Sequence, residues 1–200
     1  MMTSRTTSNR GFTLVETMVA ITILVVAIIG PYDAVEHALA ASYQARDELA
    51  ATALAQEGVE YAYGLRDNNF LCNLKNPAST VNMLYGLDGS SGTLACTVAN
   101  ARNCTAPNWC TIDPGQSAQT VCATSGTTGC PSSSALYLAN GTGGSYLYNQ
   151  ASNGTVTRFT RSLQLSSPNA QGEVIVNVLV SWNNQGPHSV KVTDVLDNWL

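Results

Sequence analysis

The residue with the clearest chemical signature is an acid inside an apolar stretch. From Phe12 to Tyr32 the chain is predominantly apolar, and Glu16 carries its only charge. A carboxylate within a membrane helix costs about 2.5–3.5 kcal/mol on insertion scales, so it is expected to have a partner and a purpose. No Lys or Arg lies between Arg10 and Arg46 to serve as that partner. The counter-charge must therefore come from another source.

A cut between Gly11 and Phe12 would supply the missing charge. The freed α-amine of Phe12 would stand four residues before Glu16, on the same face of a helix. It could neutralise Glu16 of its own chain or Glu16 of a neighbouring chain. The alternative is that Glu16 stays protonated or reaches the membrane interface with its carboxyl group.

The stretch that carries Glu16 is long enough to cross a bilayer. A helix over residues 12–32 spans about 30 Å. Residues 1–11 before it are polar and carry Arg5 and Arg10, which predicts a single pass with the N-terminus inside and the C-terminus outside. A cleaved secretory signal and a plain signal anchor are the alternatives. The anchor leaves Glu16 unexplained, and a lipoprotein signal is excluded because no cysteine precedes Cys72.

The hexapeptide Gly-Phe-Thr-Leu-Val-Glu at residues 11–16, with a basic leader before it and a long apolar helix after it, resembles the processing site of type IV pilins and type II secretion pseudopilins. The resemblance implies that a prepilin peptidase cuts after Gly11 and that Phe12 becomes the N-methylated first residue. It implies that Glu16 pairs with the Phe12 amine of an adjacent subunit. The implied partners are other pilin subunits, the inner-membrane assembly machinery and, before assembly, membrane lipid.

The helix is predicted to continue beyond the membrane. Residues 33–66 are rich in Ala, Leu, Glu and Gln, which favour helix, and residues 67–69 read as its end. Gly30 and Pro31 predict a kink, since proline removes a backbone hydrogen bond. Apolar residues recur at near-helical intervals: Val35, Leu39, Leu49, Val59 and Tyr63.

The middle of the chain, residues 67–155, is predicted to be a disulfide-rich loop insertion. Turn signals are dense, and all six cysteines lie here: Cys72, Cys96, Cys104, Cys110, Cys122 and Cys130. An even number suggests three disulfides, with fifteen possible connectivities. Short spacings favour Cys104–Cys110 and Cys122–Cys130, which leaves Cys72–Cys96. The aromatic side chains of this region either contact a surface or fill a small core: Trp109, Tyr137, Tyr146 and Tyr148.

Residues 156–200 predict an antiparallel three-stranded meander. Alternate residues from Val174 to Trp182 are all apolar, and Phe159, Leu163 and Leu165 share one parity in the segment before. The apolar face needs a cover, and the second half of the long helix is the natural one. The expected fold class is α+β: a long N-terminal helix, membrane-spanning in its first half, packed on a C-terminal antiparallel sheet. This is the architecture of pilins.

No catalytic motif is present in the sequence. His37 and His188 are the only histidines, so a histidine-based triad and a zinc site have little to draw on. Asp194 and Asp197 alone fall short of the six to eight oxygens that Ca²⁺ prefers, so we expect them to be solvated. We expect no cofactor, no metal and no enzymatic activity, and the net charge of −4 does not favour nucleic acid.

The sequence thus predicts a structural subunit of a type IV pilus or related filament, a minor pilin in particular. A pseudopilin of type II secretion is the near alternative. A membrane-anchored adhesin or binding module that does not polymerise is the alternative from another class.

Overall fold

The computed structural model describes residues 11–77, 81–89, 103–112, 120–123, 135–138, 148–149, 154–184 and 186–197. The chain divides into two compact units, Met1–Arg46 and Asp47–Leu200. The single helix α1, Leu14–Lys75, contributes residues to both. Each unit is described by itself below.

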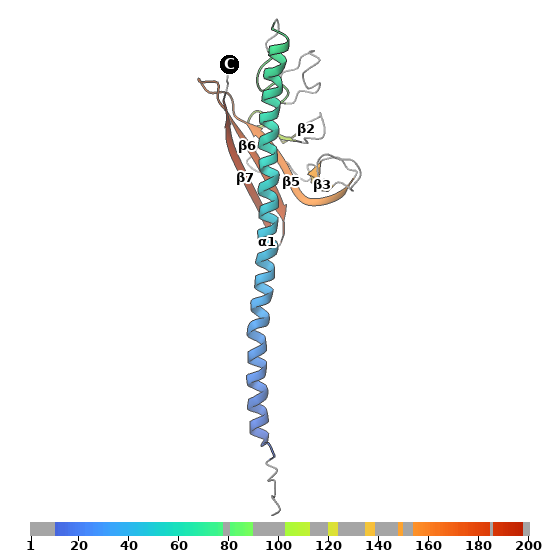
Figure 1. Cartoon of the computed structure of the whole chain (residues 1–200), viewed down its shortest axis with the longest axis vertical. Helices are drawn as coiled ribbons and strands as arrows, with labels where there is room; N and C mark the ends of the chain where they lie inside the picture. The colour runs from blue at the N-terminus through green and yellow to red at the C-terminus, as the bar shows by residue number, and fades with distance from the viewer. Residues whose placement is uncertain are drawn as a thin grey trace, which may run out of the picture. The chain divides into compact units, whose positions relative to one another are not determined.

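The described part of the first unit contains the N-terminal part of α1 (Figure 1). Its apolar side chains are exposed. It contains the one helical stretch in the described chain that is long and apolar enough to cross a membrane, with a mean hydropathy of 2.3 and none of its most apolar window buried. The helix continues through Pro31 without interruption. A bend there would leave the helix intact, and the kink expected at Gly30 and Pro31 stays a prediction.

The helix ends at Lys75, nine residues beyond the end predicted at Arg66. Asn69, one of the polar residues that read as an end, makes tertiary contacts instead. Asn69 is fully buried, and its Nδ2 donates to the carbonyls of Met83 and Tyr85, both at 3.0 Å. One turn later, Asn73 Nδ2 donates to the Val81 carbonyl and Asn73 Oδ1 accepts from the Val81 N–H. The last turns of α1 are therefore held by the segment that follows.

The second unit packs the C-terminal part of α1 on one seven-stranded sheet (Figure 1). Strands β5, β6 and β7 form the predicted antiparallel meander, with Leu163 opposite Val178 and Val178 opposite Val192. The strand bounds are β1 Trp109–Thr111, β2 Thr120–Ala123, β3 Ala135–Leu138, β4 Tyr148–Asn149, β5 Thr155–Leu165, β6 Val174–Asn183 and β7 Pro187–Leu196.

The insertion is less loop-like than predicted, since it contributes four short strands to the sheet. β1 and β3 both pair antiparallel with β5, and β2 and β4 extend them. These strands are two to four residues long, too short to show an alternating pattern in the sequence. Of the aromatic residues, Trp109 is buried and Tyr148 packs against the core, which favours the core-filling interpretation; Tyr146 lies outside the described residues.

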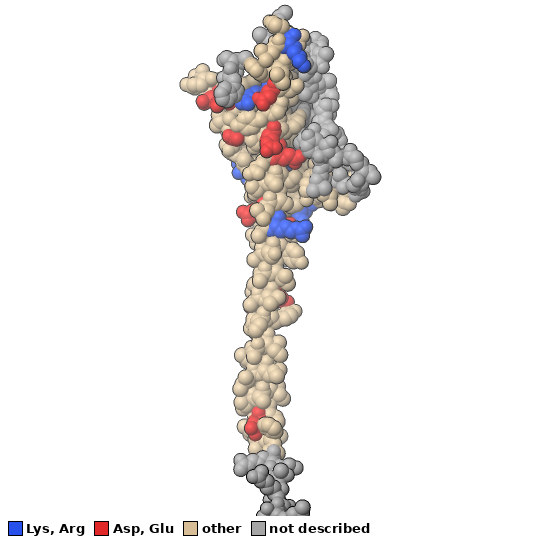
Figure 2. All heavy atoms as spheres, in the orientation of Figure 1, with Lys and Arg blue, Asp and Glu red and all other residues tan. Residues whose placement is uncertain are grey.

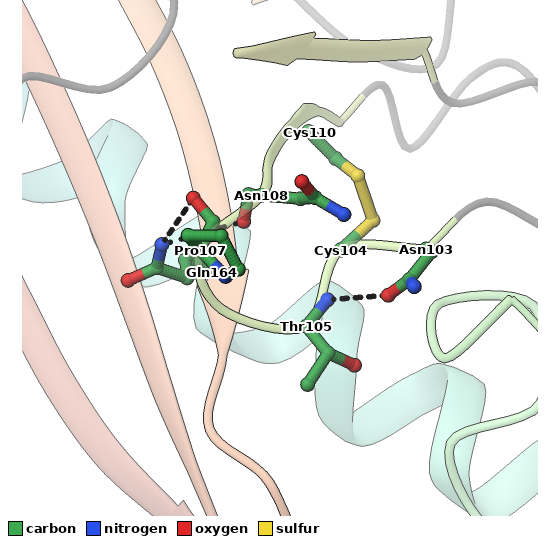
Figure 3. The surroundings of a disulfide bond; sticks show 7 residues. All are labelled: Asn103, Cys104, Thr105, Pro107, Asn108, Cys110 and Gln164. Carbon is green, nitrogen blue, oxygen red and sulfur yellow. Dashed lines mark hydrogen bonds between the residues drawn. A yellow bond between two sulfur atoms is a disulfide. The ribbon is translucent and has the colours of Figure 1, made fainter. Parts of the chain in front are cut away.

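The predicted disulfide Cys104–Cys110 is present, and it closes a short loop beside the end of β5 (Figure 3). Gln164 Nε2 donates to the carbonyls of Pro107 and Asn108 within that loop. Cys72 is also disulfide-bonded. Cys96, Cys130 and the side chain of Cys122 lie outside the described residues, so the other two pairings stay predictions.

The alternation predicted for the meander is confirmed by burial. Five residues of β6 face the helix and are 0 to 6% exposed: Val174, Val176, Val178, Val180 and Trp182. Small residues on α1 face them at three- and four-residue intervals: Ala51, Ala55, Gly58 and Ala62. A Cβ added at Gly58 would lie 2.8 Å from Val178 Cγ1 and 2.9 Å from Ile112 Cδ1. The helix therefore approaches the sheet as closely as a glycine allows.

Replacing Gly58 with Ala should lower the free energy of unfolding by about 1–3 kcal/mol, because the added methyl overpacks a site walled by a stiff β-branched side chain. Gly64→Ala is the matched control. It lies in the same helix with nothing within 4 Å of the added Cβ, so it should gain about 1 kcal/mol from helix propensity. Chemical denaturation of the detergent-solubilised full chain measures both. Equal effects of the two changes would contradict the close approach.

Candidate processing and assembly site

Residues 11–13, which include the expected cut between Gly11 and Phe12, precede the helix. Residues 11–13 have no helical structure, and α1 begins at Leu14. Thr13 acts as the N-cap: its carbonyl accepts from the Thr17 N–H at 3.2 Å, and its Oγ1 accepts from the Glu16 N–H at 3.2 Å. Because of this cap, the helix begins only after Phe12 and Thr13, and the Gly11–Phe12 bond lies outside it. A protease could therefore reach that bond without unwinding α1.

Gly11 is not required by the fold. A Cβ built there meets no heavy atom within 4 Å, and the backbone does not adopt the left-handed conformation that favours glycine. A requirement for glycine at this position would have to come from a molecule that binds the segment. That is the behaviour expected of a recognition site for a peptidase.

Glu16 stands at the third helical position, where it has a local role that the sequence analysis did not include. Thr13 and Glu16 have the spacing of a capping box, although only the bond from the Glu16 N–H to Thr13 is present. An acid in the first turn also interacts favourably with the helix dipole. These contacts stabilise the helix start, but they supply no cation. The need for a counter-charge at Glu16 therefore remains.

The side chains that flank Glu16 are apolar and uncovered. Phe12 is 78% exposed, Leu14 75% and Val15 68%. Such a surface is unstable in water at roughly 25 cal/mol per Å² of apolar area, so lipid or another apolar helix must cover it. The site is thus built for a nonpolar environment.

Sequence reasoning missed a buried ion pair that fastens α1 to the sheet. Arg161 shares the parity of the apolar residues of β5 and is 0% exposed. Its Nη1 bonds the Glu57 carboxylate and the Leu54 carbonyl of α1, and its Nη2 donates to the Ile112 carbonyl at 3.2 Å. An arginine inside an otherwise apolar parity pattern was the signal available in the sequence.

A second polar contact holds α1 where the second unit begins. Asp47 is 8% exposed, and its Oδ2 accepts from Arg158 Nη1 at 2.8 Å and from Asn184 Nδ2 at 3.0 Å. Arg158 belongs to β5, and Asn184 follows β6. Together with the Arg161–Glu57 pair, this contact fixes the position of α1 along the sheet.

Asp194, weighed above as a calcium ligand, is engaged in the fold. Its Oδ2 accepts from the Tyr63 hydroxyl at 3.2 Å, and its Oδ1 accepts from the Val195 N–H at 2.8 Å. Burial, followed by the Asp194 charge, raises the pKa of Tyr63 above its usual value. Among the described residues, no group of three or more His, Cys, Asp or Glu could hold a metal ion.

The uncovered apolar helix and the helix-on-sheet unit define a membrane-anchored α+β protein. The family model for the prokaryotic N-terminal methylation motif matches residues 6–30. That motif supports a type IV pilin-like prepilin, the class that the sequence resembles. Such a signal implies processing by a prepilin peptidase and assembly with other pilin subunits. No curated protein and no solved structure matches the chain.

Removing Glu57 and removing Arg161 should lower the free energy of unfolding by different amounts. Glu57→Ala leaves the fully buried Arg161 guanidinium without an anion and should cost about 3–5 kcal/mol of unfolding free energy. Arg161→Met should cost less, about 1–3 kcal/mol, because the Glu57 side chain is 27% exposed and can turn to water. Glu60→Ala, an exposed acid on the same helix, is the control and should change stability by at most about 0.5 kcal/mol. Denaturation of the full chain in detergent ranks the three; the reverse order for Glu57 and Arg161 would contradict the pair as described.

Proposed function

We propose that the chain is a structural subunit of a type IV pilus or related filament, and specifically a minor pilin. The observation that carries the proposal is the match to the methylation motif at residues 6–30, which contains the Gly11–Phe12 bond, Glu16 and the start of the apolar helix. The function is assembly rather than catalysis. A pseudopilus subunit would use the same N-terminal site.

The mechanism follows from the chemistry of the site. The membrane stores the subunit by covering the apolar part of α1. Cleavage after Gly11 removes Arg5 and Arg10 with the leader and creates a new cation at Phe12. Methylation of that amine would leave its charge in place. The amine then pairs with Glu16 of a neighbouring subunit, which removes the cost of an isolated carboxylate in an apolar surrounding.

The second unit is proposed to face outward. Arg5 and Arg10 favour an inside N-terminus, so the unit that follows α1 would be exported. A disulfide-bonded Cys104–Cys110 loop suits an oxidising compartment. The polar contacts of Asp47 and Arg161 would keep this unit fixed on α1 while subunits pack through the rest of the helix.

The mature N-terminus tests the processing step. Mass spectrometry of the exported protein should find N-methylated Phe12 as the first residue, with residues 1–11 absent. Gly11→Leu should abolish this cleavage while leaving the fold unchanged, since the added side chain has open space in the chain itself. An intact leader on the exported wild-type protein would favour the anchored binding module over the pilin.

The role of Glu16 is tested by incorporation into filaments. Glu16→Ala should be cleaved and methylated normally, and its content in sheared filaments should fall at least about tenfold, as one lost charge-assisted contact of 1.4 kcal/mol or more would require. Thr22→Ala, a polar change in the same apolar helix, is the matched control and should assemble normally. Normal incorporation of the Glu16 variant would remove the pairing from the mechanism. Counting this chain against total filament protein separates a minor from a major subunit.

A further inference from the structure

A three-residue sequence at the start of the disulfide loop has two side-chain groups that the fold does not use. Asn103-Cys104-Thr105 has the pattern Asn-x-Ser/Thr, the acceptor sequence for N-linked sugars. The Asn103 side chain is exposed, and its Oδ1 accepts from the Thr105 N–H at 3.0 Å (Figure 3). Neither Asn103 Nδ2 nor the Thr105 hydroxyl makes a hydrogen bond with the described residues. Both groups of the acceptor sequence are thus unpaired in the folded chain.

The local turn accounts for Asn103 but not for Thr105. A turn of this kind needs only the side-chain oxygen of Asn or Asp at its first position, and it places no demand on the side chain two residues later. Thr105 is half-buried, and its β-bridge with Leu165 involves backbone groups only. The hydroxyl group at residue 105 therefore makes no bond that the fold requires. A molecule that binds the segment from outside would use it.

The surroundings of Asn103 keep its side chain accessible on a fixed backbone. Gly89 has a φ of +85°, and a Cβ added there would lie 3.1 Å from Asn103 Cβ. Glycine at this place therefore leaves the space beside Asn103 open. The β-bridge between Asp88 and Asn103 and the Cys104–Cys110 disulfide hold the chain on either side. The acceptor amide is thus presented at the surface in a defined position.

We propose that Asn103 is a site of N-linked glycosylation. The donor is a sugar carried on polyprenyl diphosphate. Asn103 Nδ2 forms a bond to C1 of the first sugar while the bond from C1 to the diphosphate oxygen breaks. Polyprenyl diphosphate leaves with the electron pair of that bond, and Nδ2 gives one proton to a basic group of the transferase. Nothing is oxidised or reduced in this step.

The proposal concerns one of three sequences with the acceptor pattern. Asn140 and Asn153 begin the other two, and both lie outside the described residues. The observation of an exposed amide and an unpaired hydroxyl therefore applies to Asn103. The inference requires that the second unit is exported, as proposed above, but it does not require that the chain polymerises.

The sugar would project from the end of β5 that lies away from Asp47. Arg158 of β5 contacts Asp47, and Thr105 pairs with Leu165, seven residues further along the strand. Seven residues of a strand span about 23 Å. Most of the described surface in Figure 2 is uncharged, and charged residues form only 11% of the chain. A bulky, hydrated sugar would raise the solubility of such a surface.

Peptide mass spectrometry of the chain purified from the cells that naturally make it tests the site. The wild-type peptide that contains Asn103 should carry an added mass equal to one or more sugar residues. Asn103→Gln and Thr105→Ala should each lose the added mass completely, whereas Thr105→Ser keeps the hydroxyl and should retain it. Asn183→Gln, an exposed asparagine outside the acceptor pattern, is the matched control and should also retain it.

Three results would overturn the proposal. The first is an unmodified Asn103 peptide in the wild-type chain. The second is an added mass that persists in Asn103→Gln, which would place the sugar on a hydroxyl group. The third is equal modification of Thr105→Ala and Thr105→Ser, which would show that the hydroxyl is not recognised. The Cys104–Cys110 bond, read from the same spectra, should be intact in every variant, and the Ala and Ser variants keep the test decisive if Asn103→Gln disturbs the turn.

The outcomes separate this inference from the proposed function. If Asn103 carries a sugar while the chain is absent from filaments, the filament function fails and the modification site stands. If the chain is incorporated into filaments with Asn103 unmodified, the function stands and the modification site is wrong.

Discussion

The whole structure depends on one constraint: the N-terminal part of α1 has no cover of its own. None of its most apolar window is buried in the chain, so the helix is stable only against lipid or against other helices. Lipid would cover the helix without specific contacts, whereas neighbouring helices in a filament core would cover it in a fixed arrangement. Under the proposed pairing, the Glu16 carboxylate favours the filament over lipid, because a neighbouring Phe12 amine is present only in the filament. The proposed mechanism thus uses the same helix first as a membrane anchor and then as a filament element.

From Asp47 onward α1 packs against the sheet, so its side chains must fit the surface of the sheet. Several of the buried residues of α1 are now small, Ala51 and Ala55 among them, and the helix approaches the sheet most tightly at Gly58. Apolar packing alone would allow a smooth helix face to slide along a valine-rich sheet. The buried Arg161 bonds Glu57 and two carbonyl groups through Nη1 and Nη2, and a shift of α1 along the sheet would break these bonds. The polar contacts thus fix the position of α1 along the sheet, which apolar packing alone does not determine.

Much of this arrangement was predictable from local patterns. The apolar span, the processing motif and the parity of β5, β6 and β7 are read from neighbouring residues, and the Cys104–Cys110 bond from its short spacing. The end of α1 was predicted wrongly, because Asn69 stops a helix in isolation but here bonds the carbonyls of a segment fourteen residues on. The Arg161–Glu57 pair joins residues 104 apart in sequence, and no local pattern connects them. Among the short strands of the insertion, β1 and β3 pair with β5, which is remote in sequence, so no local pattern reveals them.

The chain has few charged residues, so each one has few possible ion-pair partners. Charged residues form only 11% of the chain, and from residue 11 to residue 46 they are Glu16, Asp33, Glu36 and Arg46. An ion pair at an exposed site is weak when many alternatives surround it. Where an apolar neighbour excludes water and no alternative exists, the same pair discriminates strongly between arrangements. Apolar stripes along a helix tolerate many offsets of a parallel neighbour, since one apolar contact replaces another.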